Sequence, residues 1–149
     1  MTAEEHLTLI CRLRCITDAK EIEEQITERV SDVCLDKEHF KKRVKHLSPG
    51  ARRKLSIAMS LIGEGKLLIL DEPTANLDLR SRENIWKMIK KLAKKGDISI
   101  LVSTQHIEEA DFMGTRVCVL KNGKMVECDT PENLKRHFGT GFKVKMLAN

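Results

Sequence analysis

The amino-acid sequence predicts an α/β fold in which an α-helical region precedes a parallel-sheet core. Residues 1–65 show the apolar spacing of amphipathic helices and no strand pattern. From residue 66 onward, short apolar runs alternate with helical segments, which is typical of a parallel sheet with crossover helices. We therefore expect one domain-sized chain with a helical part at residues 1–65 and an α/β part at residues 66–149.

The helical part begins with capping signals. Thr2 followed by Glu5 forms a capping box, and Asp18 followed by Glu21 is a weaker version of the same pattern. Apolar residues at spacings of three and four follow each cap, as expected for two amphipathic helices. A more basic third segment follows at residues 37–45.

The last predicted helix of the helical part starts at Ser48, Pro49 and Gly50 and ends near two glycines, Gly63 and Gly65. The elements predicted after it are, in order, a strand at 67–70, a helix at 79–94 stopped by Gly96, a strand at 98–103, a helix at 106–113, a hairpin with an Asn122-Gly123 turn between strands at 117–120 and 125–126, a helix from Pro131 and a last strand at 142–147.

The composition limits the classes of partner. The net charge of +5 keeps phosphate binding possible. Aromatic residues make up only 3% and tyrosine is absent, so side chains that could stack on bases are scarce, and we expect no nucleic acid partner. No apolar run approaches the length of a membrane span, and the polar, acidic segment at residues 1–6 is not a secretory signal.

The five cysteines indicate a reducing compartment. Their number is odd and no C-x-x-C pair occurs, so we expect neither a disulfide framework nor a zinc site. Cys11 and Cys15 stand four residues apart in a predicted helix, where they would share one face.

Two adjacent carboxylates follow the first predicted strand. An apolar run leads directly into Asp71, Glu72 and Pro73, and a run this short without alternation predicts a strand buried on both faces. Because side chains alternate along a strand, Asp71 and Glu72 should point in different directions, so that one could hold a cation and the other handle a proton. Pro73 has no N–H for the ladder and would end the strand.

The helix start at Ser48 has the features of a phosphate site. Ser48 is a natural N-cap, Pro49 suits the first helical position, and Gly50 lets the backbone be approached closely. Free N–H groups at a helix N-terminus, a hydroxyl and nearby basic residues favour an anion. A well-capped helix without a ligand is the alternative that these residues alone leave open.

Four motifs, in this order, resemble the ATPase domain of ATP-binding cassette (ABC) transporters. The signature motif corresponds to residues 47–51, the Walker B strand to 67–72, the D-loop to 75–78, and the switch histidine to His106. The resemblance covers essentially the whole chain. It implies a partial P-loop NTPase-type parallel sheet preceded by a helical subdomain.

Further segments are similar to subfamily A of these transporters, whose characterised members are largely lipid movers. These segments are residues 5–7, 52–56, 106–111, 114–117 and 134–139. The similarity implies that ATP hydrolysis is coupled to transmembrane transport of lipids, and that the domain lies at the cytoplasmic face of a membrane beside the transmembrane domains of the transporter.

The resemblance also implies a role for each residue of an ATP site. Asp71 would hold Mg²⁺, directly or through water, where the metal bridges the β- and γ-phosphates, and Glu72 would polarise the attacking water as a general base. His106 would contact the γ-phosphate.

Two such domains pair head to tail in this family, so part of the site would serve a partner. Ser48 and Gly50 would contact the ATP that is bound by a second ABC ATPase domain. Asp78 would couple the two ATP sites across the interface.

Several family features are missing or altered. These residues contain no G-x-x-x-x-G-K-[ST] loop, and residues 2–7 match a point just beyond the glutamine loop of the family. We therefore expect the latter part of an ATPase domain, inactive by itself, with apolar surface left open beside its first strand. Pro49, Ala51 and Asn76 stand where the family usually has Gly, Gln and a small residue.

Two other functions remain open from the sequence. One is a non-catalytic, truncated module that pairs with a complete ABC ATPase domain. The other is a soluble ABC protein that acts on ribosomes or DNA. The sequence alone does not choose between a fragment, a truncated gene model and a natural short form.

Overall fold

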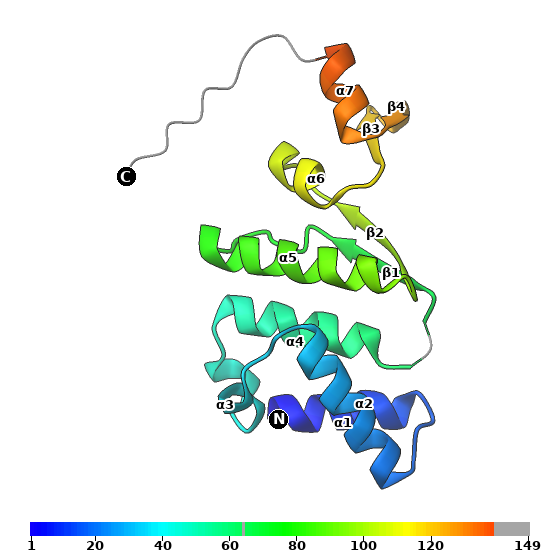
Figure 1. Cartoon of the computed structure of the whole chain (residues 1–149). Coiled ribbons are helices and arrows are strands. Elements are labelled where there is room, and N and C mark those ends of the chain that lie inside the picture. The colour runs from blue at the N-terminus through cyan, green and yellow to red at the C-terminus, as the bar shows by residue number, and fades with distance from the viewer. Residues whose placement is uncertain (64, 139–149) are drawn as a thin grey trace. The chain divides into compact units, whose positions relative to one another are not determined.

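The order of helices and strands follows the sequence prediction closely (Figure 1). The computed structural model describes residues 1–63 and 65–138, so the predicted strand at 142–147 lies outside the described residues. The chain divides into two units, residues 1–105 and residues 106–149. The proposed boundary between a helical and an α/β part at residue 65 stays a prediction.

The first unit contains α1 (Ala3–Leu13), α2 (Ala19–Asp32), α3 (Lys37–Phe40), the 3-10 helix η1 (Val44–His46), α4 (Pro49–Leu61), β1 (Leu67–Asp71), α5 (Leu79–Lys95) and β2 (Ser99–Ser103). The second unit contains α6 (Ile107–Met113), β3 (Val117–Lys121), β4 (Lys124–Asp129) and α7 (Pro131–Phe138).

The predicted capping signals begin α1 and α2. Thr2 Oγ1 accepts the N–H of Glu5 at 3.2 Å, and the Glu5 carboxylate accepts the N–H of Thr2 at 2.7 Å, which completes the capping box. Asp18 Oδ1 accepts the N–H groups of Lys20 and Glu21 at the start of α2. These bonds satisfy N–H groups that have no partner within the helix.

Both α1 and α2 end in a Schellman motif. After α1, the N–H of Ile16 donates to the C=O of Cys11, and the N–H of Cys15 donates to the C=O of Arg12, each at 3.0 Å. Cys15 takes the left-handed conformation with φ of 63°, and Cys34 does the same after α2 with φ of 49°. Cys15 therefore lies beyond the end of α1, and the prediction that it shares a helix face with Cys11 is wrong.

A single apolar core holds the helices of the first unit together. α1 packs against α2 and α4, and α4 lies alongside α5 (Figure 1). The fully buried side chains include Leu7, Leu55, Ile57, Ile62 and Ile85.

One buried carboxylate connects α2 to α5. The Asp32 side chain is only 5% exposed and pairs with Arg29 at 3.0 Å and with Lys95 near the end of α5. Pairing of this kind compensates for the cost of removing a charge from water.

β1 and β2 form a parallel pair joined by α5, in the register Leu67 opposite Ser99. Leu68 is 3% exposed, but Ile69 is 64% and Leu101 59% exposed. The prediction that the first strand is buried on both faces is wrong, because no helix among the described residues covers the face that carries Ile69. The expectation of open apolar surface beside this strand is confirmed.

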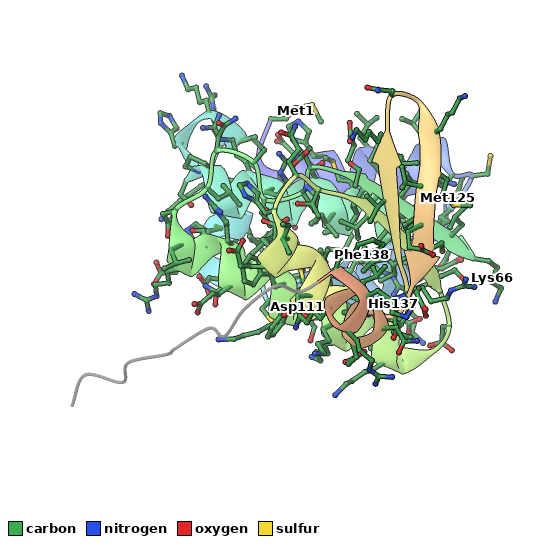
Figure 2. The ribbon with its side chains drawn as sticks, turned by 90° about the horizontal axis from the view of Figure 1, so that it is seen from above. Met1, Lys66, Asp111, Met125, His137 and Phe138 are labelled. Atoms are coloured by element: carbon green, nitrogen blue, oxygen red, sulfur yellow. The ribbon has the colours of Figure 1, made fainter. Side chains whose placement is uncertain are left out.

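The second unit is organised around an antiparallel hairpin of β3 and β4, which Figure 2 shows with Met125 labelled. Asn122 and Gly123 have φ of 52° and 72°, as a two-residue type I′ turn requires, so the predicted Asn-Gly turn is confirmed. An ion pair between Asp111 of α6 and Lys135 of α7 joins the two helices of this unit. No helix in the described part of the chain combines the length and the apolar character needed to cross a membrane.

Candidate functional site

The ends of β1 and β2 meet at a small hydrogen-bonded group. Asp71 and Ser103 are opposite each other in the last pair of the register. The Ser103 hydroxyl donates to Asp71 Oδ1 and accepts the N–H of Glu72 at 3.1 Å. The same N–H also donates to the Ser103 carbonyl at 3.2 Å. Both predicted carboxylates therefore lie at the carboxyl end of a parallel sheet, where ligands of α/β folds bind.

Glu72 lies outside the strand, in a left-handed conformation. β1 ends at Asp71, and Glu72 has φ of 45°, which is uncommon for a residue with a Cβ. The argument from strand alternation therefore does not apply to it: the turn, and not the pleat, sets the direction of this carboxylate. Strained residues of this kind persist where neighbouring contacts hold them, here the two bonds from Glu72 to Ser103.

The Asp71 carboxylate at the end of β1 fits a metal ion that is also bound by the phosphates of a nucleotide. In the described residues, no group of three or more His, Cys, Asp or Glu side chains could hold a metal alone. Mg²⁺ is usually held by one or two carboxylates together with phosphate oxygens and waters. Asp71 supplies one such carboxylate, and it lines a pocket of about 160 Å³ together with Arg53 and Ser60.

The loop after Glu72 consists of successive turns. The N–H of Ala75 donates to the carbonyl of Glu72 at 3.1 Å, and the N–H of Leu77 donates to that of Thr74 at 3.2 Å. Asn76 has φ of 61°. Asn tolerates this conformation better than most residues, which explains how it fits where a small residue was expected.

The start of α4 has the predicted cap. Ser48 Oγ accepts the N–H of Ala51 at 3.2 Å, and Pro49 occupies the first turn of the helix. The N–H of Gly50 lies at the second helical position, where no carbonyl of the helix is available to it. A pocket of about 120 Å³ opens here, lined in part by Ser48, Gly50 and Lys54.

The start of α5 lies directly against Gly50. Asp78 caps α5 by accepting the N–H of Ser81 at 2.9 Å and its hydroxyl at 2.6 Å. Both bonds lower the pKa of Asp78, and the bond from the Ser81 hydroxyl is the larger cause. A Cβ on Gly50 would lie 3.0 Å from the Ser81 oxygen. The fold thus brings Ser48, Gly50 and Asp78 together.

Ser81 and Ser103 are the two site residues that were not predicted. Asp78 followed by Ser81 is an N-cap pattern, and Ser103 ends the strand that pairs with β1, so both could have been found. His106 is the N-cap residue of α6, and its carbonyl accepts the N–H groups of Glu109 and Ala110. It belongs to the second unit, whereas the other five predicted residues belong to the first.

A comparison with protein-family models identifies the family of this chain. Residues 1–75, half of the chain, match the family model of the ABC transporter. The chain belongs to the ABC transporter family. This match includes the residues that cap α4 and the whole of β1, so it covers Ser48, Gly50, Asp71 and Glu72.

The ABC chain is similar to members of subfamily A over nearly all of its length. It is 37% identical over 147 residues to ATP-binding cassette sub-family A member 2 of Rattus norvegicus, covering 99% of this chain and 6% of that protein. It is 36% identical to ABC transporter ced-7 of Caenorhabditis elegans, covering 99% and 8%. It is also 36% identical to phospholipid-transporting ATPase ABCA7 of Homo sapiens, covering 99% and 7%. The chain thus spans less than a tenth of the length of these relatives.

Solved ABC ATPase cassettes have the same fold. The dimeric structure of MJ0796, a bacterial ABC transporter cassette, matches with a TM-score of 0.74 and 25% identity over 88% of this chain and 57% of that one. CbiO1 of Clostridium perfringens, part of the complex cbiONQ, matches with a TM-score of 0.82 and 24% identity over 91% and 53%. MJ0796 has also been solved with ADP and Pi bound. The ABC chain therefore has the predicted P-loop NTPase-type fold.

Proposed function

We propose that residues 1–149 form the part of an ABC transporter ATPase domain that activates water at one ATP and presents a signature surface to another. One observation carries the proposal: Ser103 holds Asp71 and Glu72 together at the end of two parallel strands. A pair of carboxylates at this position fits phosphoryl transfer to water.

The two carboxylates have different tasks in this proposal. Asp71, whose Oδ1 is fixed by the Ser103 hydroxyl, would hold Mg²⁺ through its other oxygen. When bound, the metal would stabilise the negative charge of the ATP phosphates. Glu72 begins the turn beyond the strand and accepts a proton from the attacking water. His106 contacts the γ-phosphate.

The signature surface consists of the starts of α4 and α5. Ser48 and Gly50 present a helix N-terminus, which favours a phosphate that is held by a second ABC ATPase domain. Ser81 lies against Gly50 and donates its hydroxyl to Asp78. Asp78 is therefore placed to couple the two ATP sites of a domain pair. Pro49 removes one N–H from this surface, and the N–H of Gly50 follows at the second helical position.

The pairing is tested by binding. The chain is expected to bind a complete ABC ATPase domain in the presence of ATP and Mg²⁺, and Ser48→Arg should abolish this binding. Thr27→Arg, which changes an exposed hydroxyl residue of α2 away from both assigned pockets, is the matched control and should bind normally. Equal binding of both variants would contradict the assigned surface.

The hydrolytic role is tested in a cassette completed with the phosphate loop of another ABC ATPase domain. There, Glu72→Gln should lower kcat by about 100-fold or more, since general-base catalysis contributes about that much. Glu108→Gln, an exposed carboxylate of α6, is the control and should leave kcat unchanged. The 149-residue chain by itself should not hydrolyse ATP, because it lacks a G-x-x-x-x-G-K-[ST] loop. Steady hydrolysis by that chain, lost in Glu72→Gln, would refute the proposal.

The transported substrate that we propose is a phospholipid, and the site of action is the cytoplasmic face of a membrane. The support is the similarity to a phospholipid-transporting ATPase of Homo sapiens. A full-length transporter that carries these residues, reconstituted in vesicles, should move a fluorescent phospholipid between leaflets only with ATP. Glu72→Gln should stop this movement, and transport that persists in the variant would contradict the role of the site.

A further inference from the structure

The hairpin of the second unit holds two cysteines opposite each other. Cys118 on β3 and Cys128 on β4 are partners in the antiparallel register, and their sulfur atoms lie 2.8 Å apart. Both are free thiols, Cys118 exposed and Cys128 half-buried. Neither residue takes part in the ATP site proposed above.

The backbone geometry of this pair suits a covalent bond. Directly opposite residues of an antiparallel pair have Cα atoms about 4.5 or 5.5 Å apart. A disulfide spans Cα separations of about 4.4 to 6.8 Å, so this position requires no backbone movement. The pairing shifts by one residue between Val119 and Leu120, so that Cys118 lies opposite Cys128 and not opposite Glu127.

The surroundings distinguish the two thiols. A guanidinium nitrogen of Arg116 lies 3.5 Å from Cys128 Sγ, close enough to stabilise negative charge that develops on this sulfur during a reaction. The hydrogen bond with Cys128 is the main cause that raises the pKa of Cys118. This arrangement favours Cys128 as the first thiol to react and Cys118 as the second.

The other cysteines lack such a partner. Cys11 is buried in α1, and Cys15 and Cys34 follow the ends of α1 and α2 in the first unit. No disulfide or cysteine-to-cysteine contact involving them is present among the described residues.

We propose that Cys118 and Cys128 form a reversible redox site, which closes to a cross-strand disulfide on exposure to a peroxide. The Cys128 thiolate attacks one oxygen of hydrogen peroxide, so that an S–O bond forms and the O–O bond breaks. Cys128 becomes a sulfenic acid, and the hydroxide that leaves takes up a proton to give water. The Cys118 thiol then attacks the sulfenic sulfur, and the S–S bond forms as a second water leaves. Two thiols are oxidised and one peroxide is reduced to two waters. A dithiol reductant reverses the change.

The test is a mass measurement on the full 149-residue chain. After treatment of the reduced chain with a few equivalents of hydrogen peroxide, the intact mass should fall by two hydrogen atoms. Peptide mapping should show one cross-link, between Cys118 and Cys128, that dithiothreitol removes. The double variant Cys15→Ser/Cys34→Ser is the control and should form the same cross-link at the same rate.

Single variants test the order of the two steps. Cys118→Ser should accumulate a sulfenic acid at Cys128 that dimedone labels, and Cys128→Ser should give neither the cross-link nor comparable labelling. The proposal is overturned if peroxide drives Cys128 to sulfinic acid without a cross-link. It is equally overturned if Cys15 or Cys34 is cross-linked as often as Cys118.

Discussion

The hydroxyl of Ser103 donates a hydrogen bond to the carboxylate of Asp71 and thereby joins the carboxyl ends of two parallel strands. The same hydroxyl accepts the N–H of Glu72. One small side chain on β2 therefore holds the Asp71 carboxylate and the Glu72 backbone, although 31 residues separate it from Glu72 in the sequence.

Removing this hydroxyl should loosen the strand ends. Ser103→Ala is expected to lower the free energy of unfolding by about 1 kcal/mol, because the Asp71 carboxylate and the Glu72 N–H each lose a partner. Urea unfolding followed by the fluorescence of Trp86, the single tryptophan, reports on the first unit. Ser99→Ala, at the other end of β2, is the control and should cost less. Equal costs for the two variants would mean that the hydroxyl bonds do not stabilise the strand end.

The cysteines that end α1 and α2 are expected to be suboptimal for stability. Cys15 and Cys34 hold left-handed conformations that glycine adopts without strain. Cys15→Gly and Cys34→Gly should each raise the free energy of unfolding, by about 1 kcal/mol at most, since glycine also gains freedom in the unfolded chain. Cys15→Ala keeps the Cβ and should give no increase. A loss of stability in both glycine variants would show that these positions are not strained.

The capping carboxylate of α5 should make stability depend on pH. The hydrogen bonds from Ser81 lower the pKa of Asp78 in the folded chain. Asp78 therefore contributes stability that is complete above its unfolded pKa of about 4 and is lost as the pH falls through the lower folded value. The difference in unfolding free energy between the wild type and Asp78→Asn should shrink as the pH is lowered from about 6 to about 2.

Ser81→Ala is the control for this pH effect. It removes the hydroxyl bond that is the main cause of the lowered pKa, so the pH dependence of the difference should weaken in this background. A difference that stays constant over the whole pH range would show that the Asp78 carboxylate is not stabilised by folding.

The two faces of β1 should respond differently to truncation. Leu68 is 3% exposed, and Leu68→Ala is expected to cost about 3 kcal/mol through lost burial and a cavity. Ile69 is 64% exposed, and Ile69→Ala should cost less than about 1 kcal/mol. Thermal unfolding of the two variants measures both changes. Similar costs would mean that the outer face of β1 is covered in solution.

Local signals in the sequence were enough to predict most elements. The capping residues Thr2, Asp18 and Ser48 identify helix starts because each satisfies N–H groups at its own helix, within three residues of chain. The Asn122-Gly123 turn was equally local. Such features depend little on the rest of the fold.

The errors concern features that depend on distant contacts. The apolar run of β1 resembles a strand covered on both sides, but only the packed structure shows which of its residues remain exposed. The conformation of Glu72 depends on Ser103, and the approach of Gly50 to Ser81 depends on how α4 packs beside α5. The cross-strand pair of Cys118 and Cys128 follows from the hairpin register, which the sequence analysis did not extend as far as Cys128.

The uncovered face of β1 and β2 also determines how the chain behaves at high concentration. Leu67, Ile69 and Leu101 are all more than half exposed on two short strands. Each encounter between two chains can bury these side chains, and exposed strands present further N–H and C=O groups for pairing. The average molar mass measured by light scattering should therefore rise with protein concentration under conditions in which the fold itself is intact, so colloidal stability sets the limit for handling this chain.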